Sequence, residues 1–313
     1  MKRDSRADPR AEAPVGLPAE EPSPRKGAVL FFPFPRNGEI LPAMNPLRIM
    51  TWNLLEGGHT PGVVPPQVSP ARTQAAQRLV EETRPDVLIL NEALWAQPLN
   101  GYHCDYSALF GFSFSCARLY ADHWGNAILS RFPIIACQDF RIYNRGGLIS
   151  VIQTPQGMLQ VGSYHPHPSR YPLNKASDYR ALVEAADPGT PLIVGGDFNA
   201  ISPEDQPNHG QLTQAFEAFS SNPGPDSARF IDGGREVFAA LAAAGMREGV
   251  PLEARRPTIP TRLIAPNHDS GMRIDHLWVN QHVDVVQGGV EHSVHADVAS
   301  DHYPVLLEVN LST

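Results

Sequence analysis

The chain lacks any long apolar run. Of its 313 residues, 42% are hydrophobic, yet no stretch reaches the roughly 18–20 consecutive apolar residues that a membrane-spanning helix needs. This excludes an integral membrane protein. Residues 1–14 carry charges with no apolar segment behind them, and the apolar stretch 27–34 is short and interrupted by prolines. Neither stretch resembles a secretory signal, so we expect a cytoplasmic location.

Cysteine and lysine are also scarce. The three cysteines, Cys104, Cys116 and Cys137, show no C-x-x-C spacing and are odd in number, so we expect free, inert thiols rather than a disulfide framework. Lysine occurs only at positions 2, 26 and 175, and the formal net charge is −8. This balance argues against a protein that coats nucleic acid by bulk charge, while a local basic groove is compatible with it.

The sequence divides into three parts. Residues 1–26 are rich in Pro, Ala, Arg and Glu and hold almost no large apolar side chains, so they are expected to form a disordered tail. Residues 27–46 combine several phenylalanines with four prolines and are expected to be an irregular lead-in segment. Apolar patterning becomes dense from residue 47, so residues 47–313 are predicted to form one domain.

Strands outnumber helices in this domain. Strand patterns cover residues 47–53, 86–91, 126–130, 133–142, 148–154, 158–164, 191–195, 274–279, 283–290 and 303–309, and helical patterns cover residues 69–83, 173–186, 211–219 and 236–244. The rest of the polar stretch 203–235 is expected to be irregular. Because the strands come both as hairpins and in strand–helix–strand units, the pattern predicts an α/β domain with mixed sheets.

Polar residues follow several of the predicted strands. The positions are Asn53, Glu92, His165, the pair Asp197 and Asn199, and the pair Asp275 and Asp301-His302 around the last strands. Loops at strand ends are where α/β enzymes usually place their sites. Asn53, Glu92 and Asp301 offer the hard oxygen ligands that suit Mg²⁺ or Mn²⁺.

The remaining polar residues suit work on an oxyanion. Asp275 could fix the tautomer of His302, and Asp197 and Asn199 lie two residues apart, so that in an extended segment both side chains reach one cleft. His165 could donate to a developing negative charge. A metal, a poised base and such donors are the parts needed to hydrolyse a phosphate ester. Each element alone also has an ordinary structural explanation, such as a turn or a cap, so the interpretation depends on their order and company.

Seven segments carry a family resemblance. They are TWNLLEGG, RPDVLILNE, GNAILSRFPI, SYHPH, PLIVGGDFNA, RIDHLWV and SDHYPVLLEV, in this order between residues 47 and 309. Together they closely resemble the endonuclease/exonuclease/phosphatase superfamily, which contains DNase I-like nucleases, AP endonucleases, inositol-polyphosphate phosphatases and sphingomyelinases. The resemblance implies a DNase I-like four-layer α/β sandwich, two packed mixed β-sheets flanked by helices. It also implies Mg²⁺-dependent phosphoester cleavage, with Mn²⁺ as a possible substitute.

The resemblance gives roles to the first three positions. Asn53 corresponds to the Asn of the family's first strand, and Glu92 to the metal-binding Glu of L-Q-E, where Asn91 replaces the Gln. His165 corresponds to the T-H-L histidine, although Tyr164 and Pro166 replace its neighbours.

The later positions match without departure. Asp197 and Asn199 correspond to G-D-F-N, Asp275 to the Asp of I-D-[YH], and Asp301-His302 to the S-D-H ending. Because no matched catalytic position is lost, the resemblance argues against an inactive member.

The mechanism is stated as a hypothesis. Glu92, with Asn53 and Asp301, would hold Mg²⁺. Asp275 would orient His302, which would take a proton from the attacking water. Asp197 would position that water or a second metal and is the alternative base. The oxygens of the phosphorus would be held by Asn199 and His165.

The substrate class stays open between three alternatives. A small soluble phosphate mono- or diester is favoured by the acidic balance and scarce lysine, whereas a DNA or RNA nuclease could use the same site. A noncatalytic binding module is the remote alternative. Arg145, Arg170 and Arg273 are candidates for gripping substrate phosphates. Neither membrane insertion nor an obligate protein partner is expected.

Overall fold

The computed structural model describes residues 45–60, 67–93, 105–120, 124–142, 145–168, 170–208, 225–267 and 271–312. The expected disordered tail at residues 1–26 and the helix expected at residues 211–219 lie outside the described residues. The same holds for the lead-in segment up to residue 44.

The first sheet has six strands in the order β11-β12-β1-β2-β4-β3. Their bounds are β1 Leu47–Asn53, β2 Val87–Asn91, β3 Phe114–Tyr120, β4 Trp124–Ser130, β11 Val283–Val290 and β12 Val305–Leu311. Strands β1 and β2 run parallel, and the other neighbours are antiparallel. The sheet therefore joins the first and last strands of the domain.

The second sheet also has six strands, in the order β5-β6-β7-β8-β10-β9. Their bounds are β5 Ile134–Ile142, β6 Arg145–Thr154, β7 Gly157–Tyr164, β8 Leu192–Asp197, β9 Arg247–Glu248 and β10 Asp275–Val279. Strands β7 and β8 run parallel, with antiparallel pairs on both sides of them.

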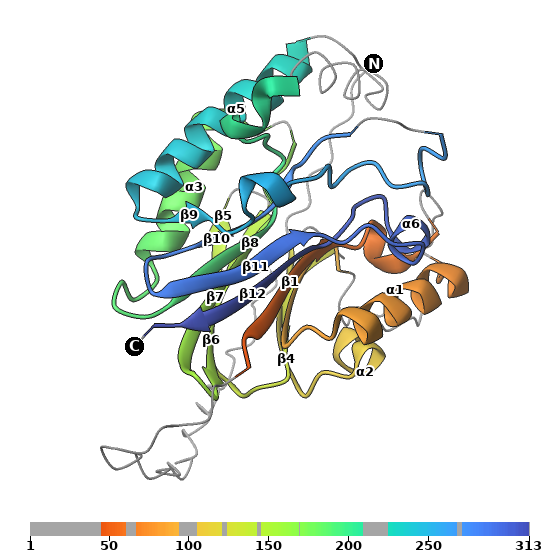
Figure 1. The fold of residues 1–313 in the computed structure, drawn as a ribbon, viewed down its shortest axis with the longest axis horizontal. Coiled ribbons are helices and arrows are strands. Elements are labelled where there is room, and N and C mark those ends of the chain that lie inside the picture. The colour runs from red at the N-terminus through yellow and green to blue at the C-terminus, as the bar shows by residue number, and fades with distance from the viewer. Residues whose placement is uncertain are drawn as a thin grey trace, which may run out of the picture. The chain divides into compact units, whose positions relative to one another are not determined.

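Helices cover the outer faces of both sheets. The longer helices are α1 Pro70–Thr83, α3 Pro172–Glu184 and α5 Pro225–Ala243, and the short ones are α2 Tyr106–Phe110, α6 Ala296–Ala299 and the 3₁₀ turns Glu56–Gly58, Pro203–Asn208 and Leu252–Ala254. Figure 1 shows α1, α2 and α6 together on one side of the sheets and α3 beside α5 on the other. No helix in the described part of the chain is long and apolar enough to cross a membrane.

Strand alternation builds two of the three apolar layers. Successive residues of a strand face opposite sides, so Met50 and Trp52 of β1 pack with Leu79 of α1. Ile49 faces the opposite side of β1 and packs with Ile193 of the second sheet in the core between the sheets.

The third apolar layer lies between the second sheet and its helices. Val194 and Trp278 of that sheet pack with Tyr179 and Leu182 of α3 and Leu241 of α5. Helices, two mixed sheets and helices in succession are the expected four-layer α/β sandwich, and that expectation is confirmed.

Several described elements were not expected, namely the helices α2 and α6, the strands β3 and β9 and the three 3₁₀ turns. A further difference is that residues 225–235, expected to be irregular, form the first half of α5. Two adjacent glycines, Gly233 and Gly234, usually interrupt a helix, but here the helix continues and Gly234 allows close packing. A Cβ there would lie 1.7 Å from the carbonyl oxygen of Ile201, so glycine lets the helix approach the chain after β8.

The expectation of three free thiols is wrong in this structure. Cys116 of β3 and Cys137 of β5 form a disulfide. Because β3 and β5 are edge strands of different sheets, the bond links the two sheets at one edge. Arg118 and Asp139, two residues further along each strand, form an ion pair at 2.9 Å. The pairing depends on which strand edges lie opposite each other, so cysteine spacing gave no sign of it.

Removing the disulfide is expected to lower the free energy of unfolding by about 3 kcal/mol, because the bond closes a loop of 21 residues and restricts the unfolded chain. Urea unfolding of the oxidised protein and of a Cys116→Ser/Cys137→Ser variant measures the difference. In the denatured, unreduced protein, a thiol titration should find one reactive thiol of the three cysteines. Three reactive thiols would contradict the bond and support a reducing compartment.

Candidate active site

The inward-facing phase of the first sheet ends in polar residues. Ile49 and Ile89 face the second sheet from β1 and β2. The same phase leads, at the carboxyl ends of these strands, to Asn53 and Asn91, which are register partners and almost fully buried. Apolar side chains therefore give way to amides at one end of the core between the sheets.

The second sheet contributes in the same way. Its inward-facing positions lead to His165, directly after β7, to Asp197 at the end of β8 and to Asp275 at the start of β10, all buried. Asp275 and Asp197 are opposite each other in the antiparallel pair of β10 and β8. Both sheets thus deliver polar side chains to one place.

Glycine and Asn91 fix the backbone that carries Asp197. Gly196 has φ +148°, and a Cβ there would lie 2.3 Å from the carbonyl oxygen of Tyr164, which only glycine tolerates. The Asn91 side chain accepts a hydrogen bond from the Asp197 amide at 2.7 Å and donates to Asn126 Oδ1 at 2.7 Å. The residue that departs from the family's L-Q-E motif therefore links the two sheets directly beneath the site.

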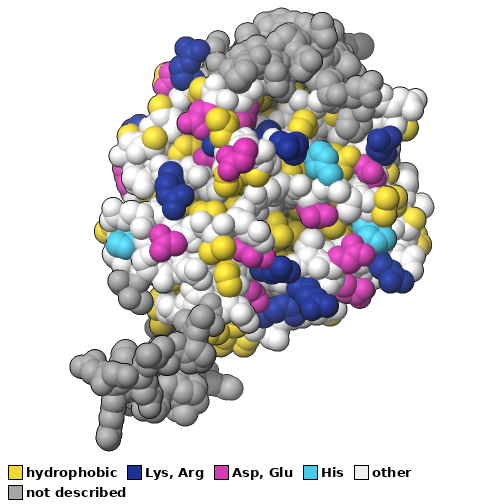
Figure 2. All heavy atoms as spheres, in the orientation of Figure 1, with side chains coloured by type: hydrophobic (Ala, Val, Ile, Leu, Met, Phe, Trp, Pro, Cys, Tyr) yellow, Lys and Arg dark blue, Asp and Glu magenta, His cyan; other side chains and the backbone are white. Residues whose placement is uncertain are grey.

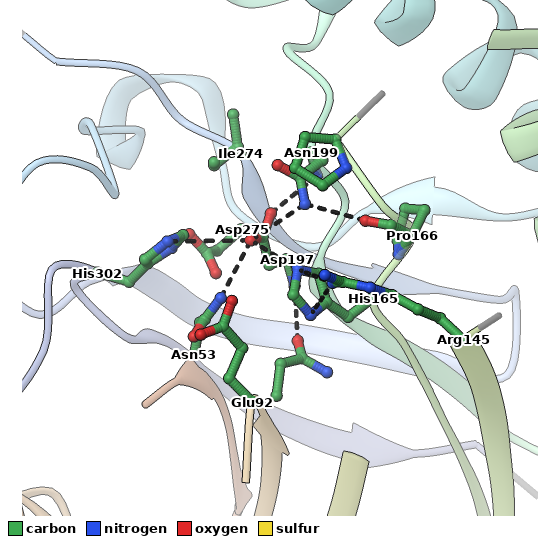
Figure 3. A network of polar contacts seen from close by, with 12 residues as sticks. Asn53, Glu92, Arg145, His165, Pro166, Asp197, Asn199, Ile274, Asp275 and His302 are labelled. Carbon is green, nitrogen blue, oxygen red and sulfur yellow. Dashed lines mark hydrogen bonds and ion pairs between the residues drawn. The ribbon is translucent and has the colours of Figure 1, made fainter. Parts of the chain in front are cut away.

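Asp197 lies at the centre of the cluster (Figure 3). Its Oδ2 accepts hydrogen bonds from Asn53 Nδ2 at 3.2 Å and Asn199 Nδ2 at 3.4 Å. His165 Nε2 lies 3.3 Å and His302 Nε2 3.9 Å from the same oxygen. One carboxylate oxygen is therefore surrounded by four groups, of which Asn53, His165 and His302 come from distant parts of the chain.

His302 is held from behind by Asp275. Its Nδ1 lies 2.8 Å from Asp275 Oδ2, and its Nε2 lies 3.9 Å from Asp301 Oδ1. The Trp52 indole donates to the His302 carbonyl at 2.9 Å, which anchors its backbone. The imidazole is thus fixed with Nε2 turned toward Asp197 and Asp301.

Glu92 approaches the cluster from the first sheet. Figure 3 shows its carboxylate beside Asn53 and pointing toward the cluster. Its Oε2 accepts a hydrogen bond from the Glu56 amide at 3.1 Å. Glu92, Leu55, Glu56 and Asn199 all have positive φ values, between 45° and 54°. Such backbone costs about 1–3 kcal/mol at each non-glycine residue and clusters at functional sites.

Close packing of these charges shifts their pKa values. Burial would lower the pKa of His302, but the carboxylates of Asp275, Asp301 and Asp197 outweigh it and raise the pKa well above its usual value. Burial would raise the pKa of Asp197, but His165 and His302 hold it well below its usual range. For Asp301, burial and the nearby charge of Glu92 raise the pKa to about 6.

The cluster fits a divalent cation. Ligand atoms of Asp197, Asp275 and His302 all lie within 4.8 Å of one another, and the three residues could hold a metal ion. Asp275 Oδ1 is fully buried and has no hydrogen-bond partner among the described residues, an arrangement that costs free energy unless a ligand satisfies the oxygen. The repulsion that raises the pKa of Asp301 would be relieved by a cation beside Glu92.

The three candidate arginines lie in different surroundings. Arg145 Nη1 is 3.0 Å from both ring nitrogens of His165, at the site. Arg170 donates to both carboxylate oxygens of Asp178, a buried residue on α3. Its guanidinium is therefore engaged within the fold.

Arg273 also lies in a buried ion-pair network. It is 3% exposed and donates to Asp205 Oδ2 at 2.9 Å and to Glu248 Oε2 at 3.1 Å. Its position two residues before Asp275 favoured a substrate role. That spacing could not show that Asp205 and Glu248, on other elements, bind the guanidinium.

One buried lysine near the site was not among the residues predicted from the sequence. Lys175 of α3 donates to the carbonyl of Asn199 at 2.7 Å and to that of Pro168 at 3.2 Å. Asn199 Nδ2 in turn donates to the carbonyl of Pro166 at 3.0 Å. These bonds tie α3 to the loop that carries Asn199. A lysine on a helix beyond the matched motifs gave no signal of this in the sequence.

A profile of the Endonuclease/Exonuclease/phosphatase family matches residues 50–302. A search of curated proteins found no match.

Among solved structures, an endonuclease/exonuclease/phosphatase from Beutenbergia cavernae is similar with a TM-score of 0.62 and 20% identity, covering 86% of this chain and 72% of that one. The 3′ phosphatase NExo from Neisseria, bound to a product DNA hairpin, has a TM-score of 0.61 and 18% identity, covering 84% and 99%. A humanized D. rerio TDP2 has a TM-score of 0.55 and 16% identity, covering 84% and 98%. At these identities the likeness shows the fold.

The network around Arg273 generates a prediction for stability against pH. Burial would raise the pKa of Glu248, but Arg273 and His276 outweigh it and lower the pKa from 4.5 to about 2. A carboxylate with a depressed pKa stabilises the fold above its unfolded value and loses that contribution as the pH falls through the folded value. The contribution is about 3 kcal/mol.

Urea unfolding from about pH 5 to about pH 3 measures this contribution. The free energy of unfolding of Glu248→Gln is expected to fall less over this range than that of the wild type. Glu253→Gln, at an exposed position on a neighbouring turn, is the matched control and should keep the wild-type slope. An unchanged slope in Glu248→Gln would contradict the assignment.

Proposed function

Because the chain belongs to the endonuclease/exonuclease/phosphatase family, a family of phosphoester hydrolases, we propose that it hydrolyses a phosphate mono- or diester of a small soluble compound with a bound divalent cation. The observation that carries the proposal is the buried Asp197 carboxylate, whose Oδ2 is surrounded by Asn53, Asn199, His165 and His302.

Two groups of residues could hold the cation. Ligand atoms of Asp197, Asp275 and His302 lie within 4.8 Å of one another, and Glu92, Asn53 and Asp301 offer oxygen ligands. We assign the cation to Glu92, Asn53 and Asp301, because the first group acts on the attacking water, with Mg²⁺ as the metal and Mn²⁺ as a substitute. When bound, the cation would act as a Lewis acid on a nonbridging phosphate oxygen. The Asn53 amide oxygen accepts a hydrogen bond from the Leu55 amide at 3.0 Å and keeps a second lone pair for a ligand. The family generally uses divalent metals, which supports the assignment.

The attacking water would be activated by Asp197 and His302. Asp197 Oδ2 and His302 Nε2 are 3.9 Å apart, so they interact strongly and take up protons as a pair. Asp275, bound to Nδ1, keeps Nε2 available to the pair. Because the pKa of His302 is raised and that of Asp197 is lowered, the pair holds its proton on the imidazole. The water proton would then pass to the Asp197 carboxylate as the water oxygen bonds to phosphorus. The P–O bond to the leaving group would break, and the leaving oxygen would take a proton from His302 or from solvent.

The phosphate oxygens would be held on the opposite side of Asp197. Asn199 and His165 both reach Asp197 Oδ2 and are placed beside one another at the site. Arg145, in contact with the His165 ring, adds a permanent positive charge. Donors fixed in advance stabilise charge that develops on the transferred phosphoryl group.

Asp197→Asn and His302→Ala are each expected to lower kcat by about 10²–10³, because each removes a preorganised charge from the reacting centre. Asp284→Asn in β11 and His282→Ala directly before β11 are the matched controls, since neither residue is part of the proposed site, and both should keep wild-type rates. Thermal unfolding verifies that all four variants fold. A catalytic variant that keeps more than about a tenth of the wild-type rate would contradict its assignment.

A small substrate is favoured because several arginines are engaged in ion pairs within the protein. Proteins that bind nucleic acid neutralise successive phosphates with lysine and arginine. Here Arg170, Arg255 and Arg273 form ion pairs with carboxylates of the protein itself. On the face shown in Figure 2, the basic side chains of the described residues stand in small groups among acidic ones rather than in a continuous stripe. Arg145 is then the arginine assigned to substrate phosphate.

A DNA or RNA nuclease is the second candidate. The similar NExo structure holds a product DNA hairpin, and the same catalytic groups would serve a nucleic-acid phosphate. A noncatalytic binding module is the remote third.

A substrate panel separates these candidates. Nucleotides, sugar phosphates, phospholipids, plasmid DNA and RNA are each assayed with Mg²⁺, Mn²⁺ or EDTA. We expect turnover of a small phosphate ester that EDTA abolishes and that depends only weakly on salt, because a small substrate releases few counterions. Cleavage of DNA or RNA with a steep salt dependence would favour the nuclease. Hydrolysis of nothing in any metal would favour the binding module.

The compartment is part of the proposal. The sequence favoured the cytoplasm, whereas a disulfide between sheet edges is typical of oxidising compartments. On the strength of the disulfide we propose an oxidising compartment. The titration of reactive thiols in the denatured protein therefore also tests the location.

A further inference from the structure

Arg72 is a buried cation that the mechanism does not use. It lies in the first turn of α1 and is 3% exposed. Its Nε donates to the carbonyl of Ala299 at 2.8 Å, and its Nη2 to those of Leu54 at 2.6 Å and Leu55 at 2.8 Å. Its Nη1 donates to the carbonyl of His59. Each of these four hydrogen bonds ends on a backbone carbonyl rather than on a carboxylate.

The four carbonyls belong to two segments that carry site residues. Leu54 and Leu55 directly follow Asn53, and Ala299 lies two residues before Asp301. Ala299 lies 227 residues after Arg72 in the sequence, yet the planar guanidinium of Arg72 binds carbonyls of both segments. The guanidinium therefore fixes the spacing between the chain after β1 and the chain after α6.

Ser300 completes the connection between the two segments. Its Oγ donates to the carbonyl of Asn53 at 2.6 Å and lies 3.3 Å from Asp301 Oδ1. The His302 amide donates to the same Oγ at 3.2 Å. Arg72 on one side and Ser300 on the other thus hold Asn53 and Asp301 at a set distance.

The charge of Arg72 also acts on the site. Asp301, Glu56 and Glu92 are the nearby carboxylates that favour the charged guanidinium against the cost of its burial. A guanidinium keeps its proton throughout the ordinary pH range. The positive charge of Arg72 offsets part of the repulsion between Glu92 and Asp301. Since its four hydrogen bonds go to backbone carbonyls, they leave the oxygens of both carboxylates for a cation.

We propose that Arg72 is a positioning residue: by binding four carbonyls at once, it aligns Asn53 and Asp301 with Glu92 before a divalent cation arrives. The inference rests on the proposed function, because it takes these three residues as the cation ligands. Lysine would keep the charge, but its three donors share one nitrogen and cannot span carbonyls that a planar fork with five donors reaches.

Mn²⁺ binding to the metal-free full chain, measured by calorimetry without substrate, tests the proposal. Arg72→Lys is expected to raise the Kd for Mn²⁺ by about 10–100-fold, the usual effect of losing a group that orients metal ligands. Arg78→Lys, at an exposed position on the same helix, is the matched control and should bind as the wild type does. All measurements are made at a temperature where circular dichroism shows each variant to be folded.

A merely structural role would lower the thermal stability of Arg72→Lys and leave the Mn²⁺ affinity of the folded protein unchanged, and that result would overturn the proposal. If Arg72→Lys does not fold, Ser300→Ala cuts the same connection one step further on. A raised Kd in Ser300→Ala supports the proposal, and an unchanged Kd overturns it. Absence of Mn²⁺ binding to the wild type would instead refute the proposed function, so the two failures are distinguishable.

Discussion

The arrangement of the site depends on the need to stabilise the buried Asp197 carboxylate. It is almost completely buried, and a buried charge is costly unless hydrogen bonds and opposite charge surround it. Asn53 comes from the first sheet, His165 and Asn199 from the second, and His302 from the segment after α6. The fold must therefore bring both sheets and one helix end together before this single carboxylate is stabilised.

The same constraint explains why the site stands at the end of the core rather than on its surface. In the strands that carry the site, the inward-facing positions turn polar only at one end, as from Ile193 to Asp197 in β8. The apolar part fixes the separation of the sheets, and Gly195 keeps that separation small, since a Cβ there would lie 2.6 Å from Leu277 and 2.8 Å from Ile89. Packing between the sheets thus sets the distances among the polar groups.

Much of this could be predicted from the sequence. The strand and helix patterns gave an α/β domain with mixed sheets, and the polar residues that follow the strands gave the candidate residues, because both depend on local patterns. The four layers were implied by the family resemblance. Contacts between different elements could not be predicted. Arg170 and Arg273 were assigned to substrate, but their carboxylate partners stand on other elements. The Cys116–Cys137 bond required knowing which sheet edges meet.

Arg72 belongs to the same group of unpredictable residues for a different reason. Its partners are backbone carbonyls, which every residue possesses, so no side-chain pattern marks them. Edge strand β3 was missed because its side chains do not form an apolar run, and the short helices α2 and α6 because they span too few residues for a helical period to show.

Because the proposed catalytic groups are divided between two sheets, hydrolysis would report on how those sheets fit together. An expanded, molten form of the chain could keep all its strands and helices and still hold its sheets a little too far apart or out of line. In such a form Asn53 and Asp197 would no longer meet, although spectroscopy of the backbone would look native. Enzyme turnover in this architecture is therefore a finer gauge of tertiary order than secondary-structure content.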